Sequence, residues 1–132
     1  MRRATTLLFA VFLLTLAAAP VSAASKSPFV GAWTGIDING STEALTVSSG
    51  TDVRVTLIDL GGSICANNGS PTAVFTGSLT GTVAGDTLSA TWDRARCGPV
   101  SFDVSGWDPG RWTYDATTDR LFDGYVYWNR RS

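Results

Sequence analysis

The sequence predicts an all-β fold, an eight-stranded antiparallel up-and-down barrel with one disulfide bond. After residue 24, no segment repeats its apolar residues at helical spacing, and apolar residues often occupy every second position, as in strands with one buried face. Turn signals recur every eight to twelve residues or so, a spacing that is typical of barrels and sandwiches. Nearly all acidic residues are Asp, which favours turns over helices.

Turn residues separate the first four expected strands. Asn39-Gly40 is the strongest short hairpin signal in the chain and ends the first strand. A Ser-Gly-Thr-Asp turn separates the second strand from the third, which alternates Val and Leu with other residues. Gly77 and Gly81 predict bends or bulges in the fourth strand, as a barrel requires. These strands are expected at residues 30–38, 42–48, 53–60 and 72–83, with a long loop at 61–71.

The last four expected strands carry most of the aromatic residues. Leu88 and Trp92 lie on one face of the fifth strand, and Trp112 and Tyr114 on one face of the seventh. Asp123-Gly124 predicts a bulge inside the eighth strand. Short sequential strands joined by tight turns suit an up-and-down barrel, whose closure removes exposed edges. These strands are expected at residues 87–96, 100–105, 111–116 and 120–130.

The first 23 residues have the pattern of a cleaved secretory signal. Arg2 and Arg3 form a basic start, residues 7–19 are almost wholly apolar, and Val21 and Ala23 match a small-x-small cleavage site. The apolar run is short for a membrane helix, which needs about 20 residues. We therefore expect a signal peptide over residues 1–23, one barrel domain over residues 24–132, no stable membrane anchor, and a secreted or periplasmic location.

Cys65 and Cys97 are the two cysteines of the chain. In an oxidising compartment an even count at this spacing predicts a disulfide bond, worth roughly 3–4 kcal/mol on the chain-entropy model. Without Arg2 and Arg3, eight basic residues face eleven acidic ones, a net charge of −3. Nucleic acid and anionic membranes are therefore not expected partners, because phosphate binding needs clustered Lys and Arg.

The sequence contains no histidine. This excludes Ser-His-Asp and Cys-His catalysis and His-ligated metal sites, and no phosphate loop or dinucleotide fingerprint is present. We expect no enzyme activity, no catalytic residue, no metal and no cofactor. Asp115, Asp119 and Asp123 recur at four-residue spacing, which leaves open a calcium site or a catalytic carboxylate pair, but turn chemistry is the preferred interpretation.

Aromatic residues crowd the second half of the domain and suggest a ligand site. An aromatic-lined cup would suit a small apolar or planar ligand or a sugar ring, whereas the alternative interpretation is that the rings fill the core. Trp107 lies in a Gly- and Pro-rich turn, where it is either an exposed contact or a ring folded back over the barrel mouth. The candidate ligand-binding residues are Trp92, Trp107, Trp112, Tyr114, Tyr125 and Tyr127.

The two ends of the domain carry short motifs that suggest a family. Gly31-x-Trp33 follows an aromatic residue in the first expected strand, and Arg130 and Arg131 follow an aromatic pair in the last. This pattern resembles the calycin superfamily of lipocalins, fatty-acid-binding proteins, avidins and small bacterial protease inhibitors. The resemblance implies that Trp33 plugs one end of the barrel and that Arg130 or Arg131 packs over it, closing first strand to last. No lipocalin second motif, helical lid or biotin-contacting set matches.

Two binding functions follow as expectations. The leading hypothesis is a secreted barrel that binds a small apolar, aromatic or sugar ligand. The alternative is a protein-binding module, such as an inhibitor of an exported hydrolase, because the stapled barrel carries two long loops. A filled interior would favour the second hypothesis. Asn39 and Asn68 both lie in Asn-x-Ser sequons, and the sequence leaves their glycosylation open.

Overall fold

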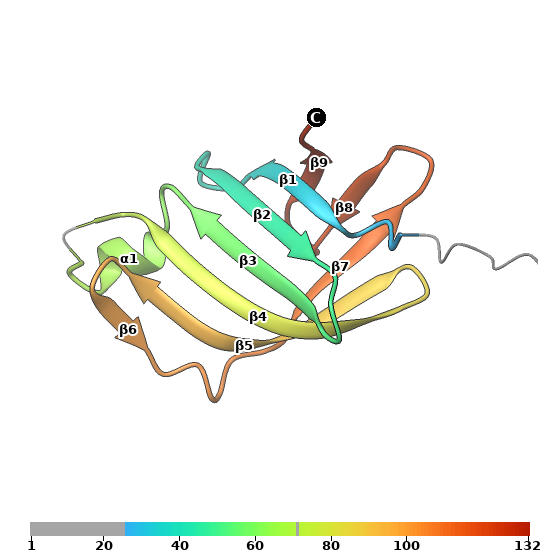
Figure 1. Cartoon of the computed structure of the whole chain (residues 1–132). Coiled ribbons are helices and arrows are strands. Elements are labelled where there is room, and N and C mark those ends of the chain that lie inside the picture. The colour runs from blue at the N-terminus through green and yellow to red at the C-terminus, as the bar shows by residue number, and fades with distance from the viewer. Residues whose placement is uncertain (1–25, 71) are drawn as a thin grey trace, which may run out of the picture.

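The computed structural model describes residues 26–70 and 72–132, so the predicted signal peptide lies outside the described residues. The described chain forms nine strands and one short helix (Figure 1). The strands are β1 (Gly31–Ile36), β2 (Thr42–Ser48), β3 (Val53–Asp59), β4 (Phe75–Ala84), β5 (Thr87–Cys97), β6 (Val100–Phe102), β7 (Gly110–Asp115), β8 (Arg120–Phe122) and β9 (Tyr127–Arg130), and the helix is α1 (Ser63–Asn67).

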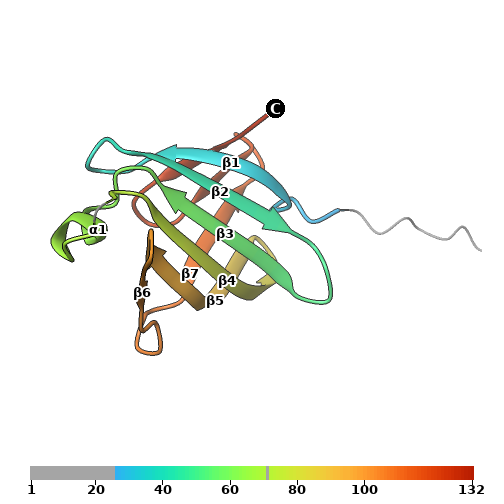
Figure 2. The ribbon, with the colours of Figure 1, turned by 60° about the vertical axis from the view of Figure 1, so that its left-hand side comes forward.

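Eight of these strands form a closed ring, which confirms the predicted all-β antiparallel barrel. The hydrogen-bonded order is β1, β2, β3, β4, β5, β7, β8, β9 and back to β1, and every pairing is antiparallel. Figure 2 shows β1 to β4 as one continuous curved wall with β7 crossing behind it. Within the ring each strand has two neighbours, so its backbone groups are paired on both sides.

The eight strands of the ring are not the same eight strands that the sequence predicts. The expected strand at 120–130 is interrupted, because Asp123 accepts backbone hydrogen bonds from Tyr125 and Val126 and Gly124 has φ +102°, so a hairpin turn replaces the predicted bulge. The expected strand at 100–105 contributes only β6, which pairs with the end of β5 outside the ring. The fourth strand begins at Phe75 and shifts register beside Gly77, between Ser78 and Leu79.

The predicted disulfide is confirmed and ties a helical loop to the barrel. Cys65 lies in α1, inside the segment expected to be a loop, and its sulfur bonds to that of Cys97 at the end of β5. Figure 1 shows α1 and β6 together at this end of the barrel. In the part of the chain that the structure describes, no helix has both the length and the hydropathy needed to cross a membrane.

Two clusters of buried side chains stabilise the fold. The larger one fills the barrel between the two ends, and the smaller one surrounds the disulfide under α1 and β6. Alternation along the strands produces this division, since every second residue of β2, for example, points inward. The fully buried large side chains are Trp33, Trp128, Phe29, Leu45, Leu79, Leu88, Leu121, Val47 and Val55.

Candidate functional site

Tryptophan rings occupy the interior of the barrel. Trp33, Trp112 and Trp128 are each at most 3% exposed. Gly77 on β4 makes room for another ring on the neighbouring strand β5, because a Cβ at Gly77 would collide with the ring of Trp92. An eight-stranded barrel has an interior just wide enough for side chains. The geometry therefore favours core filling over an open cup.

One end of the barrel is closed by Trp33 and Arg130. The Arg130 guanidinium carbon lies 4.0 Å from the centre of the Trp33 ring. The same guanidinium donates to the carbonyl oxygens of Val30 at 3.1 Å and Pro28 at 2.7 Å, and the Trp33 indole donates to Phe29 O at 2.9 Å. Of the two arginines considered, Arg130 therefore takes the closing position. The contact joins the first strand to the last.

Asp119 completes this closure from the β7–β8 turn. Its carboxylate accepts two hydrogen bonds from Arg130, both at 2.9 Å, and one from the Tyr114 hydroxyl at 3.0 Å. The Arg130 guanidinium holds the pKa of Asp119 below its usual value, and the bond to Asp119 raises the pKa of Tyr114. Gly31 has φ +148° and lies against the Arg130 guanidinium. Arg131, the next residue after Arg130, is exposed. The Asp119 carboxylate is therefore engaged in an ion pair with Arg130.

The aspartates at four-residue spacing do not form one site. Asp115 accepts from the Thr117 backbone and the Thr118 hydroxyl, which is the turn chemistry that the sequence favours. Asp123 organises the β8–β9 turn and accepts from the Trp128 indole at 3.0 Å. Both carboxylates therefore accept hydrogen bonds from residues of their own turn or hairpin.

Two of the six candidate aromatic residues lie together near the disulfide. Trp92 and Trp107 meet edge to face with ring centroids 5.2 Å apart, and Phe75 and Phe102 also pack against Trp107. The Trp92 indole donates to Asp108 O at 3.0 Å. Trp107 is partly buried here, so it is folded back over the barrel end as in the second of the two interpretations.

The other four candidates lie elsewhere. Trp112 is buried in the main core, and Tyr114 belongs to the closed end. Tyr125 and Tyr127 point to solvent, with exposed fractions of 80% and 60%. The structure therefore separates the predicted ligand-binding residues into an interior set, two ends and an outer surface.

Exposed apolar side chains gather on two neighbouring hairpins. We call the exposed Ile36, Ile38, Tyr125 and Tyr127, together with the half-buried Phe122, the apolar surface. Ile36 and Ile38 are 62% and 83% exposed, and the Phe122 and Tyr127 rings stack with centroids 4.5 Å apart. Large exposed apolar side chains are common singly, but a group of them indicates a contact surface.

Strand register makes this surface continuous across the barrel wall. β1 and β9 pair at Thr34 and Asn129, and continuing this register by two residues places Ile36 opposite Tyr127. A shallow recess of about 250 Å³ lies beside Ile36 and is lined by Thr34, Thr42 and Asn129. The surface thus has both a protruding part and a depression.

The opposite wall of the ring is basic and polar. Arg54 on β3 and Arg94 and Arg96 on β5 line two adjoining recesses of about 440 and 150 Å³ among Thr and Ser side chains. In a ring of eight strands, β3 and β4 lie across from β8 and β9. These three arginines therefore lie across the barrel from the apolar surface, whereas the exposed Arg120 lies on β8, on the same outer face as Phe122.

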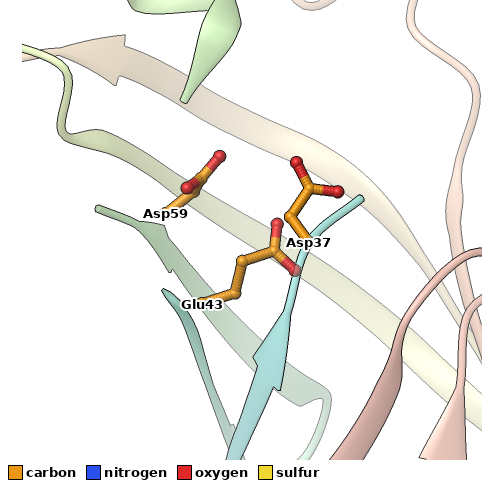
Figure 3. A group of neighbouring side chains, drawn as sticks. All are labelled: Asp37, Glu43 and Asp59. Carbon is orange, nitrogen blue, oxygen red and sulfur yellow. The ribbon is translucent and has the colours of Figure 1, made fainter. Parts of the chain in front are cut away.

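Three carboxylates meet at the barrel end opposite the closed one. We call Asp37, Glu43 and Asp59 the acidic cluster, shown in Figure 3, and one oxygen from each lies within 4.8 Å of the others. Glu43 and Asp59 are direct cross-strand partners on the inner face of β2 and β3 and are 9% and 8% exposed. Like charges placed directly opposite each other destabilise a sheet.

Burial and neighbouring charges perturb Glu43 strongly. Desolvation raises the pKa of Glu43 to about 7, and the charges of Asp37, Asp59 and Asp123 add to the increase. Sequence reasoning missed this cluster, although a signal was present. Glu43 follows the same alternation as the apolar residues of its strand, so the sequence places its glutamate on the buried face.

We expect the raised pKa of Glu43 to make stability depend on pH. The unfolded chain releases this proton near pH 4.5 and the folded chain near pH 7, so the contribution is fully present below pH 4.5 and is lost as pH rises to 7. The loss should be about 2–3 kcal/mol for this shift. Urea unfolding between pH 5 and 8 in EDTA would measure it.

The matched variants for this measurement are Glu43→Gln and Asp52→Asn. Glu43→Gln should remove most of the decline between pH 5 and 7, because the amide does not ionise. Asp52 is exposed in the β2–β3 turn, so Asp52→Asn should keep the wild-type profile. An unchanged decline in Glu43→Gln would show that another group is responsible.

Comparison with known proteins found no relative of this chain. No family model matches the chain, no curated protein matches it, and no solved structure matches it.

Proposed function

We propose that this protein is a binding module that contacts a protein partner through the apolar surface. The observation that carries the proposal is the gathering of Ile36, Ile38, Tyr125 and Tyr127, each at least 60% exposed, on two adjacent hairpins. Exposed aromatic residues on a rigid scaffold are the usual anchors of protein interfaces. Burying them against a partner would remove apolar area from water.

The filled interior supports a surface contact over an interior ligand. Trp33, Trp112 and Trp128 take the space that a lipocalin-like cup would need. The Arg130–Trp33 closure agrees with the proposed relation to calycins, a group that includes protease inhibitors as well as carriers of small ligands. Binding without catalysis is the role that this combination favours.

Charge on this side of the barrel indicates the chemistry of the partner. Asp123 lies in the same hairpin as Tyr125, close enough to Glu43 to raise its pKa, and Asp37 precedes Ile38. The arginines 54, 94 and 96 lie across the ring, and Arg120 lies on the far side of Phe122 from these two aspartates. We therefore propose a partner whose apolar contact area is flanked by Lys or Arg side chains, so that opposite charges meet at the rim.

The compartment is part of the same proposal. Cys65 and Cys97 are both fully buried, and their disulfide is a feature of proteins that work in oxidising compartments. Together with the predicted signal peptide, this supports a partner that is itself exported.

Crosslinking and affinity measurements test the proposal. A photoreactive benzoylphenylalanine in place of Tyr127 should capture a protein from the exported fraction, whereas the same group in place of Thr56, on the opposite wall, should not. The captured partner is then purified, and its affinity for variants is measured. Ile36→Ser combined with Tyr127→Ser should weaken binding at least about 30-fold, the effect of losing interface anchors.

A second double variant serves as the control. Val74→Ser combined with Val100→Ser removes two side chains of lower exposure, one before β4 and one on β6, that are not part of the apolar surface, and it should bind within about twofold of wild type. Equal affinity of the two double variants would exclude the apolar surface. Saturable quenching of tryptophan fluorescence by a small apolar ligand, without protein capture, would favour the leading hypothesis from the sequence instead.

A further inference from the structure

The acidic cluster contains an unsatisfied carboxylate. Glu43 is 9% exposed, and within residues 26–70 and 72–132 its Oε2 atom is buried with no hydrogen-bond partner. Figure 3 shows the Glu43 side chain extending toward Asp37, with Asp59 on the neighbouring strand. In the same described residues, the ion pair found is that of Arg130 with Asp119, far from this end. A buried acceptor without a donor is costly, so this oxygen points to a missing positive partner.

In Asp37 and Asp59, one carboxylate oxygen is fixed by hydrogen bonds and the other is available to a ligand. Asp59 Oδ1 accepts from the Ser41 hydroxyl at 2.7 Å and from the Gly61 backbone at 2.9 Å. Asp37 Oδ1 accepts from the Ile38 backbone at 2.6 Å. In each residue the second oxygen is not part of these bonds. Supporting hydrogen bonds of this kind orient the ligands of metal sites.

We propose that Asp37, Glu43 and Asp59 form a binding site for a divalent cation of the Ca²⁺ type. Oxygen ligands from several carboxylates are the donors that hard cations prefer. Ca²⁺–O bonds of 2.3–2.6 Å let one ion join oxygens up to about 5 Å apart, whereas Mg²⁺ joins oxygens up to about 4 Å apart. The three oxygens lie within 4.8 Å of one another, a range that one Ca²⁺ can join, and the dehydration that Mg²⁺ resists favours Ca²⁺ at a partly buried site. Asp37 is only partly buried, so the ion has a route from solvent.

A cation here would fasten three separate segments of the barrel end. Asp37 follows β1, Glu43 lies in β2, and Asp59 ends β3. The ion would offset the repulsion between the cross-strand partners Glu43 and Asp59 and would fix the turn that carries Ile38. This site does not depend on the proposed protein contact.

Titration of the purified full-length protein with CaCl₂ after EDTA treatment tests the site. Isothermal calorimetry should show one binding event per chain. At a Ca²⁺ concentration 100 times Kd, the thermal midpoint should rise by about 10 °C. Glu43→Gln and Asp37→Asn should each raise Kd at least about tenfold, and Asp52→Asn should leave it unchanged. Mg²⁺ should bind more weakly than Ca²⁺.

Several results would overturn the proposal. One is the absence of both binding heat and thermal shift with Ca²⁺ in the wild type, which would leave a shared proton as the compensation. Another is equal Ca²⁺ affinity of the wild type and both cluster variants, or equal loss in Asp52→Asn, since either would place the ion elsewhere. Asp37 is in a turn and partly exposed, so Asp37→Asn should leave folding intact. It therefore tests the cation site even where Glu43→Gln changes folding.

Discussion

Replacing Arg130 with methionine should lower the free energy of unfolding by about 3–4 kcal/mol, because it removes a cation–π contact and several charge-assisted hydrogen bonds together. The guanidinium lies over Trp33, donates to Val30 O and Pro28 O, and pairs with Asp119. The side chain is 32% exposed and Asp119 49%, so solvent weakens the ion pair and most of the loss comes from the other contacts. Thermal unfolding should show a midpoint lower by roughly 10–20 °C.

The neighbouring arginine provides the matched control. Arg131 is exposed, so Arg131→Met should change the midpoint by no more than about 2 °C. Arg130→Lys keeps the charge but not the planar fork of donors, and it should recover less than half of the lost stability. Equal midpoints for the wild type and Arg130→Met would show that the barrel is closed by other contacts.

Removing the disulfide should lower the free energy of unfolding by about as much as Arg130→Met. The bond closes a loop of 33 residues, counted from a sequence separation of 32, for which the chain-entropy model gives about 4 kcal/mol. The variant Cys65→Ala/Cys97→Ala should therefore unfold at a clearly lower urea concentration. Its tryptophan emission should also shift to the red, because Trp92 and Trp107 pack in the cluster that surrounds the bond.

The reduced wild type is the control for this prediction. Kept in reductant, it should match the double variant in both midpoint and emission, because the two proteins then lack the same constraint. The far-UV spectrum should stay that of a barrel in both, since the eight ring strands do not depend on α1. A loss below about 1 kcal/mol would show that the unfolded chain is already restricted around this loop.

The hairpins of the barrel could be predicted from the sequence because they rest on local patterns. Alternating residues and turn signals such as Asn39-Gly40 specify hairpins, and the hairpins add up to a ring. The packing of Arg130 or Arg131 over Trp33 was implied by the resemblance to calycins, and the choice between the two arginines needed the strand register.

The acidic cluster and the spread of the aromatic residues depend on register, which the sequence specifies weakly. Glu43 and Asp59 become neighbours only once β2 and β3 are aligned. The strand alternation places Trp112 inside and Tyr127 outside, and Trp107 folds inward because Trp92 and Phe75 are there to receive it. The split of the last expected strand follows from three hydrogen bonds to Asp123, a detail of turn geometry.

The closure of β1 against β9 also determines when the molecule can finish folding during synthesis. The hairpins from β1 to β5 need only nearby residues, but Arg130 reaches Val30 across 100 positions. Such distant contacts carry a large loop-closure cost and need both segments to be present. A nascent chain that has not yet reached Tyr127 can hold every earlier hairpin while β1 and β8 stay unpaired on one side. Until those residues are present, the free edges of β1 and β8 can pair with other chains, so completion of β9 also removes a site of aggregation.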